Sequence, residues 1–541
     1  MKSHRLRYVL VIIGLCLSLS AIVYRLIDLT IIQREFLVKE TKARSNRLQK
    51  INVPRGDILD RHGKPLAMSL YKQSVWVNPQ ETVWSDEETQ QVAKILGLSS
   101  GVINKKINQK NQFVYLKRHL SSEQFKLLKS LDAHYGLHFV KEFGRYYPAG
   151  ASASQLVGRV NIDGKGQEGI ELAYDDSLKG KAGQEEYSVN RKGQIISERN
   201  IIKQAKQGKH IQLTLDRHAQ FIAYQALRQT VQQFNAASAE AIVIAIPSGD
   251  VLAVANYPSY DPNKPLKSLD LIRNKALTDI NEPGSIIKPI SMVALLNYGF
   301  DEQTIIDTNP GHLRLNGHDI HDEFKPGQLS LSDIIRRSSN IGMSKLMLQV
   351  PQDDAANLYQ KMGLNKTITL GFPGERSGHS NLHRKMTDFD RAAISFGYGI
   401  ETSLMQIANG IAIIANDGKN VPIHIIKDQS TEQSEQVISS DVAHKVRDMM
   451  VKVTQKGGTG FRADVKNVAV AGKTGTTRML HNGQYQEEDY RASFIGFAPA
   501  DKPKYLIAVQ VDKPRGSIYG GRVAAPAFKT IFSQLWAYHL S

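Results

Sequence analysis

Residues 281–296 read NEPGSIIKPISMVALL. Pro283 and Gly284 interrupt regular structure just before an apolar run, which predicts that a helix begins there. Ser285 then lies in the first helical turn, and Lys288, three residues on, lies on the same face. A serine hydroxyl is a poor nucleophile unless a base lies beside it, and burial lowers the pKa of a lysine enough for it to be that base. The free N–H groups of a helix start also suit a developing oxyanion.

Ser-x-x-Lys alone is a weak signal, because so short a pattern occurs by chance in a chain of 541 residues. A second match runs from Ser69 to Lys72. It has no Pro-Gly interruption before it and no apolar helical run after it. We therefore predict a solvated strand or turn at Ser69.

A polar trio, Ser338-Ser339-Asn340, lies between two apolar helical runs. Buried polar groups need hydrogen-bond partners, and a Ser and Lys pair needs a third group to orient it and to relay protons. The ordinary alternative is a helix N-cap, a position for which Ser and Asn are both favoured.

The stretch 468–478 reads VAVAGKTGTTR. Its first residues predict a buried strand, continued by Lys473, Thr474, Gly475 and Thr476. A glycine within a strand often marks the close approach of another backbone or a ligand, and the hydroxyls and ammonium beside it suit a carboxylate. The alternative is a strand end with a turn.

Three other patterns concern a possible cofactor, metal or disulfide site. Residues 164–169 read GKGQEG, which matches the dinucleotide fingerprint by spelling, but no long βαβ pattern follows. His318 and His321 lack an evident third metal ligand, and we predict a surface loop there. The single cysteine, Cys16, cannot form an intramolecular disulfide. No metal or organic cofactor is expected.

The N-terminus predicts a membrane anchor. Residues 8–24 read YVLVIIGLCLSLSAIVY without a charge, which is near the lower limit for a helix that crosses a bilayer. No small-x-small cleavage site follows, so an uncleaved anchor is favoured over a signal peptide. The positive residues in MKSHRLR place the N-terminus in the cytoplasm and the chain beyond Arg25 outside.

The formal net charge is +17. Such an excess can indicate nucleic acid, an anionic membrane surface or an acidic polymer as neighbour. The basic residues are scattered and show no zinc-finger spacing, so we expect no nucleic-acid partner.

Between the anchor and the C-terminus, the pattern of apolar and turn-forming residues changes near residue 210. We expect a helical stalk at 28–50, short strands with one helix near 122–131, and a linker or exposed hairpin at 175–212. A helix at 217–235 and a strand at 241–246 then open an α/β alternation. The predicted parts are a cytoplasmic tail (1–7), a transmembrane anchor (8–27), a pedestal (28–210) and a main domain (211–541).

Taken together and in this order, Ser-x-x-Lys, Ser-x-Asn and Lys-Thr-Gly resemble the penicillin-binding and serine β-lactamase superfamily. RGDILDRHGKPLA (55–67), RYYPAGASASQLVG (145–158) and GKGQEGIE (164–171) look like the N-terminal blocks of its class B members. Several stretches resemble the division-specific FtsI type: ANYPSYDPN (255–263), TDINEPGSIIKP (278–289), LGFPGERSG (370–378), SFGYG (395–399) and YGGRVAAPAF (519–528). Two features depart from that type, namely Thr477 where Ala is frequent, and residues 400–406, which lack a frequent Pro.

The resemblance implies an α/β (α+β) transpeptidase domain, a sheet covered by helices on both faces, on an elongated mixed pedestal with one N-terminal transmembrane helix. It implies a serine-type peptidoglycan D,D-transpeptidase in the inner membrane, acting on D-Ala-D-Ala pentapeptide stems and blocked by β-lactams. An FtsW-type glycosyltransferase and other division proteins are the implied partners. Alternatives are an elongation-type transpeptidase, a β-lactamase or β-lactam sensor, and a non-catalytic division scaffold.

It also implies a role for each motif residue. Ser285 is the nucleophile, Lys288 its base, and Ser338 the group that protonates the leaving amine. Asn340 orients Lys288 and the substrate amide. Lys473 keeps the local potential positive. The stretch Thr474-Gly475-Thr476 binds the terminal carboxylate, and the N–H groups of Ser285 and Thr476 form the oxyanion hole.

Overall fold

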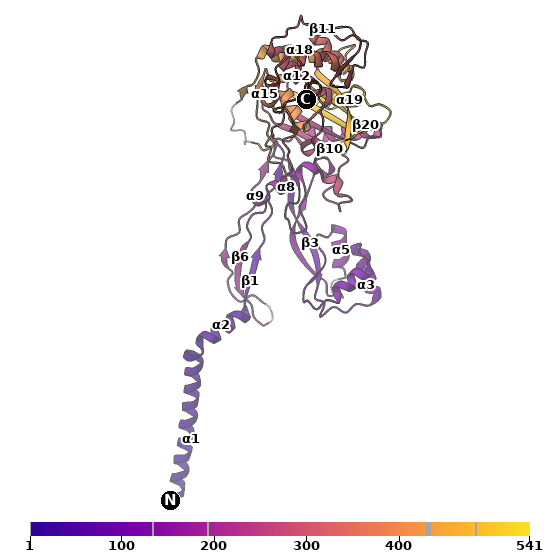
Figure 1. Ribbon diagram of the computed structural model, residues 1–541. Coiled ribbons are helices and arrows are strands. Elements are labelled where there is room, and N and C mark those ends of the chain that lie inside the picture. The colour runs from indigo at the N-terminus through magenta and orange to yellow at the C-terminus, as the bar shows by residue number, and fades with distance from the viewer. Residues whose placement is uncertain (1, 132–134, 192–193, 428–433, 482–483, 541) are drawn as a thin grey trace. The chain divides into compact units, whose positions relative to one another are not determined.

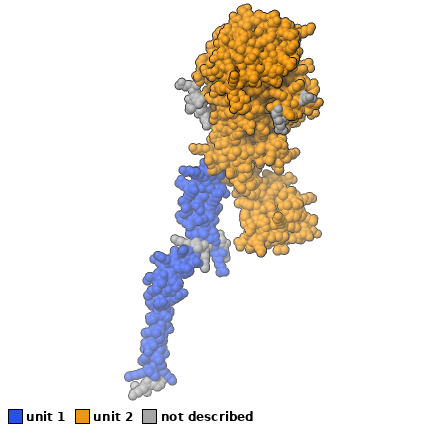
Figure 2. Space-filling view, in the orientation of Figure 1, with its two compact units in different colours: residues 1–54, 180–208 blue, residues 55–179, 209–541 orange. Residues whose placement is uncertain are grey.

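The computed structural model describes residues 2–131, 135–191, 194–427, 434–481 and 484–540. The chain divides into two compact units, which are coloured separately in Figure 2. The first contains Met1–Pro54 and Gly180–Gly208, and the second contains Arg55–Lys179 and Lys209–Ser541.

The first unit begins with a long apolar helix. Arg5–Ile32 is the one helix within the described residues that is long and apolar enough to cross a membrane. It comprises most of α1 (Lys2–Ile27) and one π-helical turn, η1 (Asp28–Ile32). Arg25 Nη1 donates to Asp28 Oδ2 at 2.6 Å, so a charged pair closes the apolar run.

The rest of the first unit is a short helix and a small sheet. The predicted helical stalk at 28–50 is helical in η1 and in α2 (Arg34–Ser45), but it ends at Ser45 because β1 (Asn46–Ile51) follows directly. This strand pairs antiparallel with β6 (Gly183–Ser188), which also pairs with β7 (Asn200–Lys203). The segment predicted as a linker or hairpin therefore supplies two strands to a three-stranded sheet.

In the second unit, residues 55–179 are organised around one long strand, β3 (Pro65–Val77). It pairs antiparallel with β5 (His138–Tyr146), and also with the shorter strands β2 (Ile58–Leu59) and β4 (Val114–Lys117). Figure 1 shows α3 (Asp86–Leu96) and α5 (Ser122–Lys129) gathered at one end of β3. With α4 (Ser100–Ile107) they enclose a small core of their own.

Only one of these three helices was predicted. α5 confirms the helix expected near 122–131, whereas α3 and α4 were missed. The sequence nevertheless contains a signal for the start of α3, because Ser85 and Glu88 form a reciprocal capping box.

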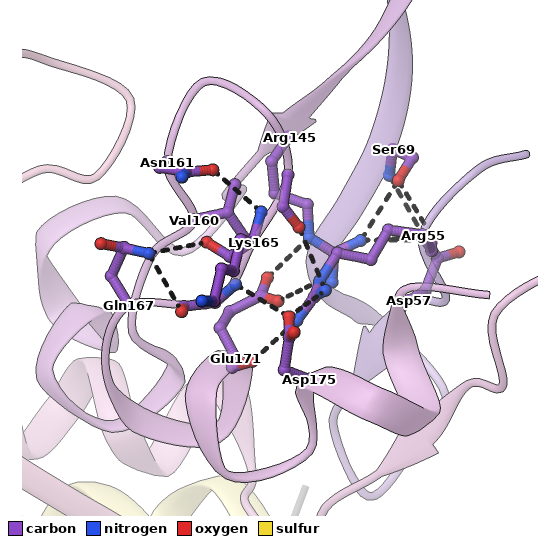
Figure 3. A network of polar contacts seen from close by, with 12 residues as sticks. Arg55, Asp57, Ser69, Arg145, Val160, Asn161, Lys165, Gln167, Glu171 and Asp175 are labelled. Atoms are coloured by element: carbon purple, nitrogen blue, oxygen red, sulfur yellow. Dashed lines mark hydrogen bonds and ion pairs between the residues drawn. The ribbon is translucent and has the colours of Figure 1, made fainter. Parts of the chain in front are cut away.

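A buried ion network ties the N-terminal motifs together (Figure 3). Glu171 is fully buried and accepts from Arg55 Nε and Arg145 Nε, both at 2.6 Å. Arg55 Nη1 also donates to Asp175 at 2.6 Å. Ser69 lies in β3 and donates its hydroxyl to the Arg55 carbonyl at 2.9 Å, as a structural residue of a strand.

Residues 209–541 form a sheet of five antiparallel strands in the order β10-β9-β21-β20-β19. These are β9 (Ser238–Ala245), β10 (Val251–Tyr257), β19 (Ala471–His481), β20 (Gln484–Ala498) and β21 (Tyr505–Asp512). The helices are α10 (Arg217–Gln233), α11 (Lys275–Thr278), α12 (Lys288–Tyr298), α13 (Leu331–Arg337), α14 (Asn340–Met347), α15 (Gln352–Lys361), α16 (Asp388–Ser395), α17 (Leu404–Ala415), α18 (Ser440–Thr454) and α19 (Gly520–Leu540).

Helices cover both faces of this sheet, as expected. Side chains alternate along each strand, so Ile242 and Ile244 belong to one core and Val243 to the other. The first core includes residues of α12, α17 and α18, and the second is closed by α10 and α19. The predicted helix at 217–235 and strand at 241–246 are confirmed as α10 and β9.

Candidate active site

The predicted nucleophile lies in a tight turn directly before α12. Gly284–Ile287 form one 3₁₀ turn, and Lys288 is the first residue of the helix. Ser285 is half-buried within that turn. Gly284 has φ +57°, and a Cβ there would lie 2.3 Å from Thr477 Oγ1, so the backbone conformation and the space both require glycine. Gly284 thus packs the turn directly against β19.

Lys288 is fully buried and donates hydrogen bonds to two residues of the polar trio, Ser338 and Asn340. Its Nζ donates to the Ser338 carbonyl at 2.7 Å, to Ser338 Oγ at 3.1 Å and to Asn340 Oδ1 at 2.7 Å. Burial lowers the pKa of Lys288 to about 7, and the charges of Asp322 and Glu323 oppose this shift. A large fraction of Lys288 is therefore neutral near neutral pH and able to accept a proton.

The Ser338–Asn340 trio is a junction between two helices. α13 ends at Arg337, and Ser338 follows with φ 64° and ψ 43°, a left-handed conformation that is uncommon for serine. Ser339 is the N-cap of α14 and accepts from the Gly342 N–H at 2.9 Å. The N-cap interpretation is thus correct for Ser339, while Ser338 and Asn340 contact Lys288.

Lys473 reaches the same hydroxyl from β19. Its Nζ donates to Ser338 Oγ at 2.9 Å and to the Thr474 carbonyl at 2.9 Å. Lys473 is fully buried, and burial together with the nearby Lys288 lowers its pKa well below the usual value. Ser338 Oγ therefore lies between two buried amines, an arrangement suited to moving a proton.

The Lys-Thr-Gly stretch lies on β19, which runs beside the Ser285 turn. A Cβ at Gly475 would lie 3.0 Å from Ile286 Cγ2 and 3.5 Å from the Pro283 carbonyl, so the strand and the turn are in close contact. Thr474 donates to Thr459 Oγ1 at 2.9 Å, and Thr476 Oγ1 accepts from the Gly520 N–H at 3.3 Å. Three motifs that are distant in sequence thus meet around Ser338 and this turn.

Sequence reasoning missed Asp322, which organises the trio. Its carboxylate accepts from Ser339 Oγ and the Asn340 N–H, both at 2.5 Å, and from the Ile341 N–H at 3.2 Å. No signal in the sequence separates it from other acidic residues, because it precedes Ser339 by 17 positions.

A cleft of about 840 Å³ opens beside these residues. Asn340 lines it, as do His318 and His321, which were predicted as a surface loop and lie on β13 (His318–His321) of a hairpin. Glu282 also lines it and accepts from Tyr485 Oη at 2.9 Å. Burial raises the pKa of Glu282.

Two family models match the chain over most of its length. Residues 240–533 match the penicillin binding protein transpeptidase domain, and residues 50–213 match the penicillin-binding protein dimerisation domain. The pairing of these two domains, with the motifs placed as above, decides the family. The chain is a class B penicillin-binding protein.

Similar full-length relatives agree with this family. A Pseudomonas aeruginosa protein named "Probable peptidoglycan D,D-transpeptidase PbpC" is 37% identical over 97% of this chain and 94% of its own. The Escherichia coli K12 protein named "Peptidoglycan D,D-transpeptidase FtsI" is 34% identical over 97% of this chain and 90% of its own. This penicillin-binding protein is accordingly an enzyme, a peptidoglycan D,D-transpeptidase.

Solved structures give the same fold. Penicillin binding protein 3 from Mycobacterium tuberculosis, solved as a complex with aztreonam, has a TM-score of 0.70 and 25% identity, and the match covers 91% of this chain and 97% of that one. The transpeptidase domain of Burkholderia pseudomallei penicillin-binding protein 3 is 34% identical with a TM-score of 0.55, covering 60% of this chain and 96% of that one. The predicted transpeptidase fold with an N-terminal domain is confirmed.

Proposed function

We propose that this penicillin-binding protein cross-links peptidoglycan stems at the division septum through an acyl-enzyme on Ser285. The observation that carries the chemistry is the meeting of Lys288, Lys473 and Ser338 within hydrogen-bond distance, beside the turn that bears Ser285. The relatives named FtsI support the septal role.

In the proposed first step, Ser285 Oγ attacks the carbonyl of the penultimate D-Ala of a pentapeptide stem. Lys288 takes the serine proton, which its lowered pKa favours. The backbone N–H groups of Ser285 and Thr476 stabilise the oxyanion, and each such donor contributes about 3 kcal/mol or more in other enzymes.

In the steps that follow, the proton passes to the leaving D-Ala amine through Ser338 Oγ, which accepts from both buried amines. Asn340 orients Lys288 and the substrate amide. Lys473 keeps the local potential positive, and the stretch Thr474–Thr476 holds the terminal carboxylate. An amine of a neighbouring stem then attacks the acyl-enzyme and forms the cross-link. A β-lactam enters the same site and acylates Ser285.

Fluorescent penicillin tests the nucleophile. We expect stable labelling of the wild type and of Ser69→Ala, and none of Ser285→Ala. Ser69 is the matched control because it is the serine of the other Ser-x-x-Lys pattern and lies in β3. Labelling that survives in Ser285→Ala would show that another residue is the nucleophile. Release of hydrolysed penicillin with turnover would instead favour a β-lactamase.

The septal role and an FtsW-type polymerase partner are tested in cells. Depletion is expected to give filaments, and the protein is expected to copurify with that polymerase from membranes. Spheres on depletion would assign it to elongation. Rescue of division by Ser285→Ala would assign it a scaffold role.

For topology, we propose that residues 1–7 are cytoplasmic, 8–27 span the inner membrane, 28–210 form the pedestal and 211–541 form the transpeptidase domain. The helix Arg5–Ile32 and the basic residues before the apolar run support this orientation. A reporter enzyme active only outside the cytoplasm, fused after residue 541, is expected to be active. Activity of the same reporter fused before residue 1 would reverse the orientation.

A further inference from the structure

A second cavity of about 600 Å³ lies in the second unit and shares no lining residue with the cleft that Asn340 lines. Its walls come from the turn between β2 and β3, from residues 148–152, from the start of α10 and from the end of α19. The volume is typical of sites for small organic ligands. The walls belong to both the N-terminal and the transpeptidase parts of the unit, so a ligand there would contact both.

The two carboxylates of this cavity are engaged in structural contacts. Asp60 Oδ1 accepts from the backbone N–H groups of His62 and Lys64, at 2.9 and 2.8 Å. Asp216 Oδ1 accepts from the His218 N–H at 2.8 Å as the cap of α10, and its Oδ2 lies 3.2 Å from His62 Nε2. Both aspartates are buried. They shape the walls and offer little to a ligand.

Unlike the two buried aspartates, the two cationic side chains of the cavity are exposed to solvent. Lys64 and Arg217 are both exposed and line it from separate segments. Within the part of the chain that the structure describes, neither side chain forms an ion pair. Arg and Lys side chains pair strongly with carboxylates, and Arg does so in a bidentate manner. Two cations on one cavity therefore favour a ligand with more than one negative group.

Aromatic rings provide the other half of the surface. Phe221 and Tyr538 are 50% and 43% exposed, although both are large apolar side chains. The His218 ring lies 4.1 Å from the Tyr538 ring at 34°, so the two form a continuous face. Exposed aromatic groups rimmed by polar ones are typical of binding surfaces, and they pack well against rings or apolar stems.

We propose that this cavity is a second binding site for peptidoglycan, taking a carboxylate-bearing disaccharide-peptide unit that is not being cross-linked. Its carboxylates pair with Lys64 and Arg217, and its sugar or apolar groups pack on Phe221 and Tyr538. The identity of the ligand rests on the function proposed above, since the polymer on which the enzyme acts carries both kinds of group. Phosphate could satisfy the same cations, so the test includes it.

The test uses the full-length protein in detergent after complete acylation by penicillin, which blocks the catalytic site and reports that the protein is folded. A purified disaccharide-tetrapeptide, with a single terminal D-Ala, is titrated by calorimetry. The variant is Lys64→Met combined with Arg217→Met. Its control is Lys267→Met combined with Lys502→Met, an equal charge change on exposed residues outside both cavities.

We expect the acylated wild type and control to bind the fragment, and the Lys64/Arg217 variant to bind at least tenfold more weakly while it still takes up penicillin fully. Absence of binding to the acylated wild type, or equal binding by both variants, would overturn the proposal. So would tight binding of inorganic phosphate that the fragment cannot displace. Failure of penicillin to acylate the wild type would instead refute the proposed catalytic function.

Discussion

Lys288 and Lys473 are two fully buried amines that share one hydroxyl, that of Ser338. Burial without a carboxylate partner disfavours the charged form of a lysine, and two neighbouring amines disfavour it further. Asn340 Oδ1 and backbone carbonyls satisfy the donors without adding a full negative charge. The site therefore keeps a base available near neutral pH.

The first prediction concerns pH. The pKa of Lys288 is lowered from 10.5 to about 7, so the neutral amine becomes abundant as the pH rises through about 7. The second-order rate constant of penicillin acylation should rise about tenfold per pH unit below that value and level off above it. Stopped-flow acylation from pH 5 to 9 measures it, with thermal unfolding at each pH as control. A flat profile would exclude Lys288 as the base.

The second prediction concerns Asp322. Removal of its carboxylate in Asp322→Ala frees Ser339 and Asn340, a loss of about 1–3 kcal/mol of hydrogen bonding. The second-order rate constant of penicillin acylation should fall roughly tenfold or more. Because the charge of Asp322 raises the pKa of Lys288, the pH profile should also move to lower pH. Asp307→Ala, an exposed acidic residue that caps a turn, should leave both quantities unchanged. An unchanged profile in Asp322→Ala would show a purely structural role.

At the scale of single elements, the turn before α12 determines where Ser285 lies. Gly284 contacts Thr477 of β19, and a Cβ at Gly397 would lie 2.2 Å from the Gly284 carbonyl. The turn is thus held on two sides by close contacts, one with the Thr477 side chain and one with the Gly397 backbone, which a side chain at Gly284 or Gly397 would prevent.

The third prediction follows from that packing. Gly284→Ala should destabilise the protein by about 1–3 kcal/mol, because φ is positive and the new methyl meets Thr477. Since small displacements of a nucleophile are costly, acylation should fall up to about a hundredfold. Gly299→Ala has φ +118° but open space around its Cβ, so it should lose stability and keep its acylation rate. Equal acylation losses in both variants would refute the packing argument.

The helices and strands also show which parts of the structure could be predicted from the sequence. The helix start that bears Ser285 and Lys288, the strand that bears Lys473 and the helix α10 could be predicted, because each has a local pattern. Asp322 could not, because its role comes from a hairpin that folds back onto α14. The antiparallel pair of β6 and β7 agrees with the hairpin alternative for 175–212, but the pairing of β6 with β1 could not be predicted, since β1 is remote in sequence.

At the scale of the whole molecule, one prediction concerns the network of Figure 3. Arg55→Met leaves the buried Glu171 with Arg145 alone, and loss of one partner of a buried ion pair costs about 3–5 kcal/mol. Calorimetry should show a lower unfolding temperature for part of the molecule. Arg199→Met removes a half-exposed pair with Glu185 and should cost about 1 kcal/mol or less. Equal shifts of the unfolding temperature in both variants would contradict a stabilising role for the Arg55–Glu171 ion pair.

A further prediction concerns the anchor. Deletion of residues 2–32 removes the helix that can cross a membrane, and the protein should move from the membrane fraction to the soluble fraction after a carbonate wash. Penicillin should still acylate it with the same stoichiometry, because the site residues lie in the second unit. Retention in the membrane fraction would point to a second contact with lipid.

The discontinuous first unit has a consequence for the order of events during biosynthesis. Its strand β1 pairs with β6, Asn46 opposite Ser188, and residues 55–179 lie between them in the chain. In the topology proposed above, the chain is exported N-terminus first, so β1 emerges before β6 and keeps an unpaired edge until β6 follows. Pairing of such high sequence separation is slow. Nascent chains arrested before residue 183 should therefore be unusually sensitive to proteases near β1, and those arrested after residue 208 should be resistant.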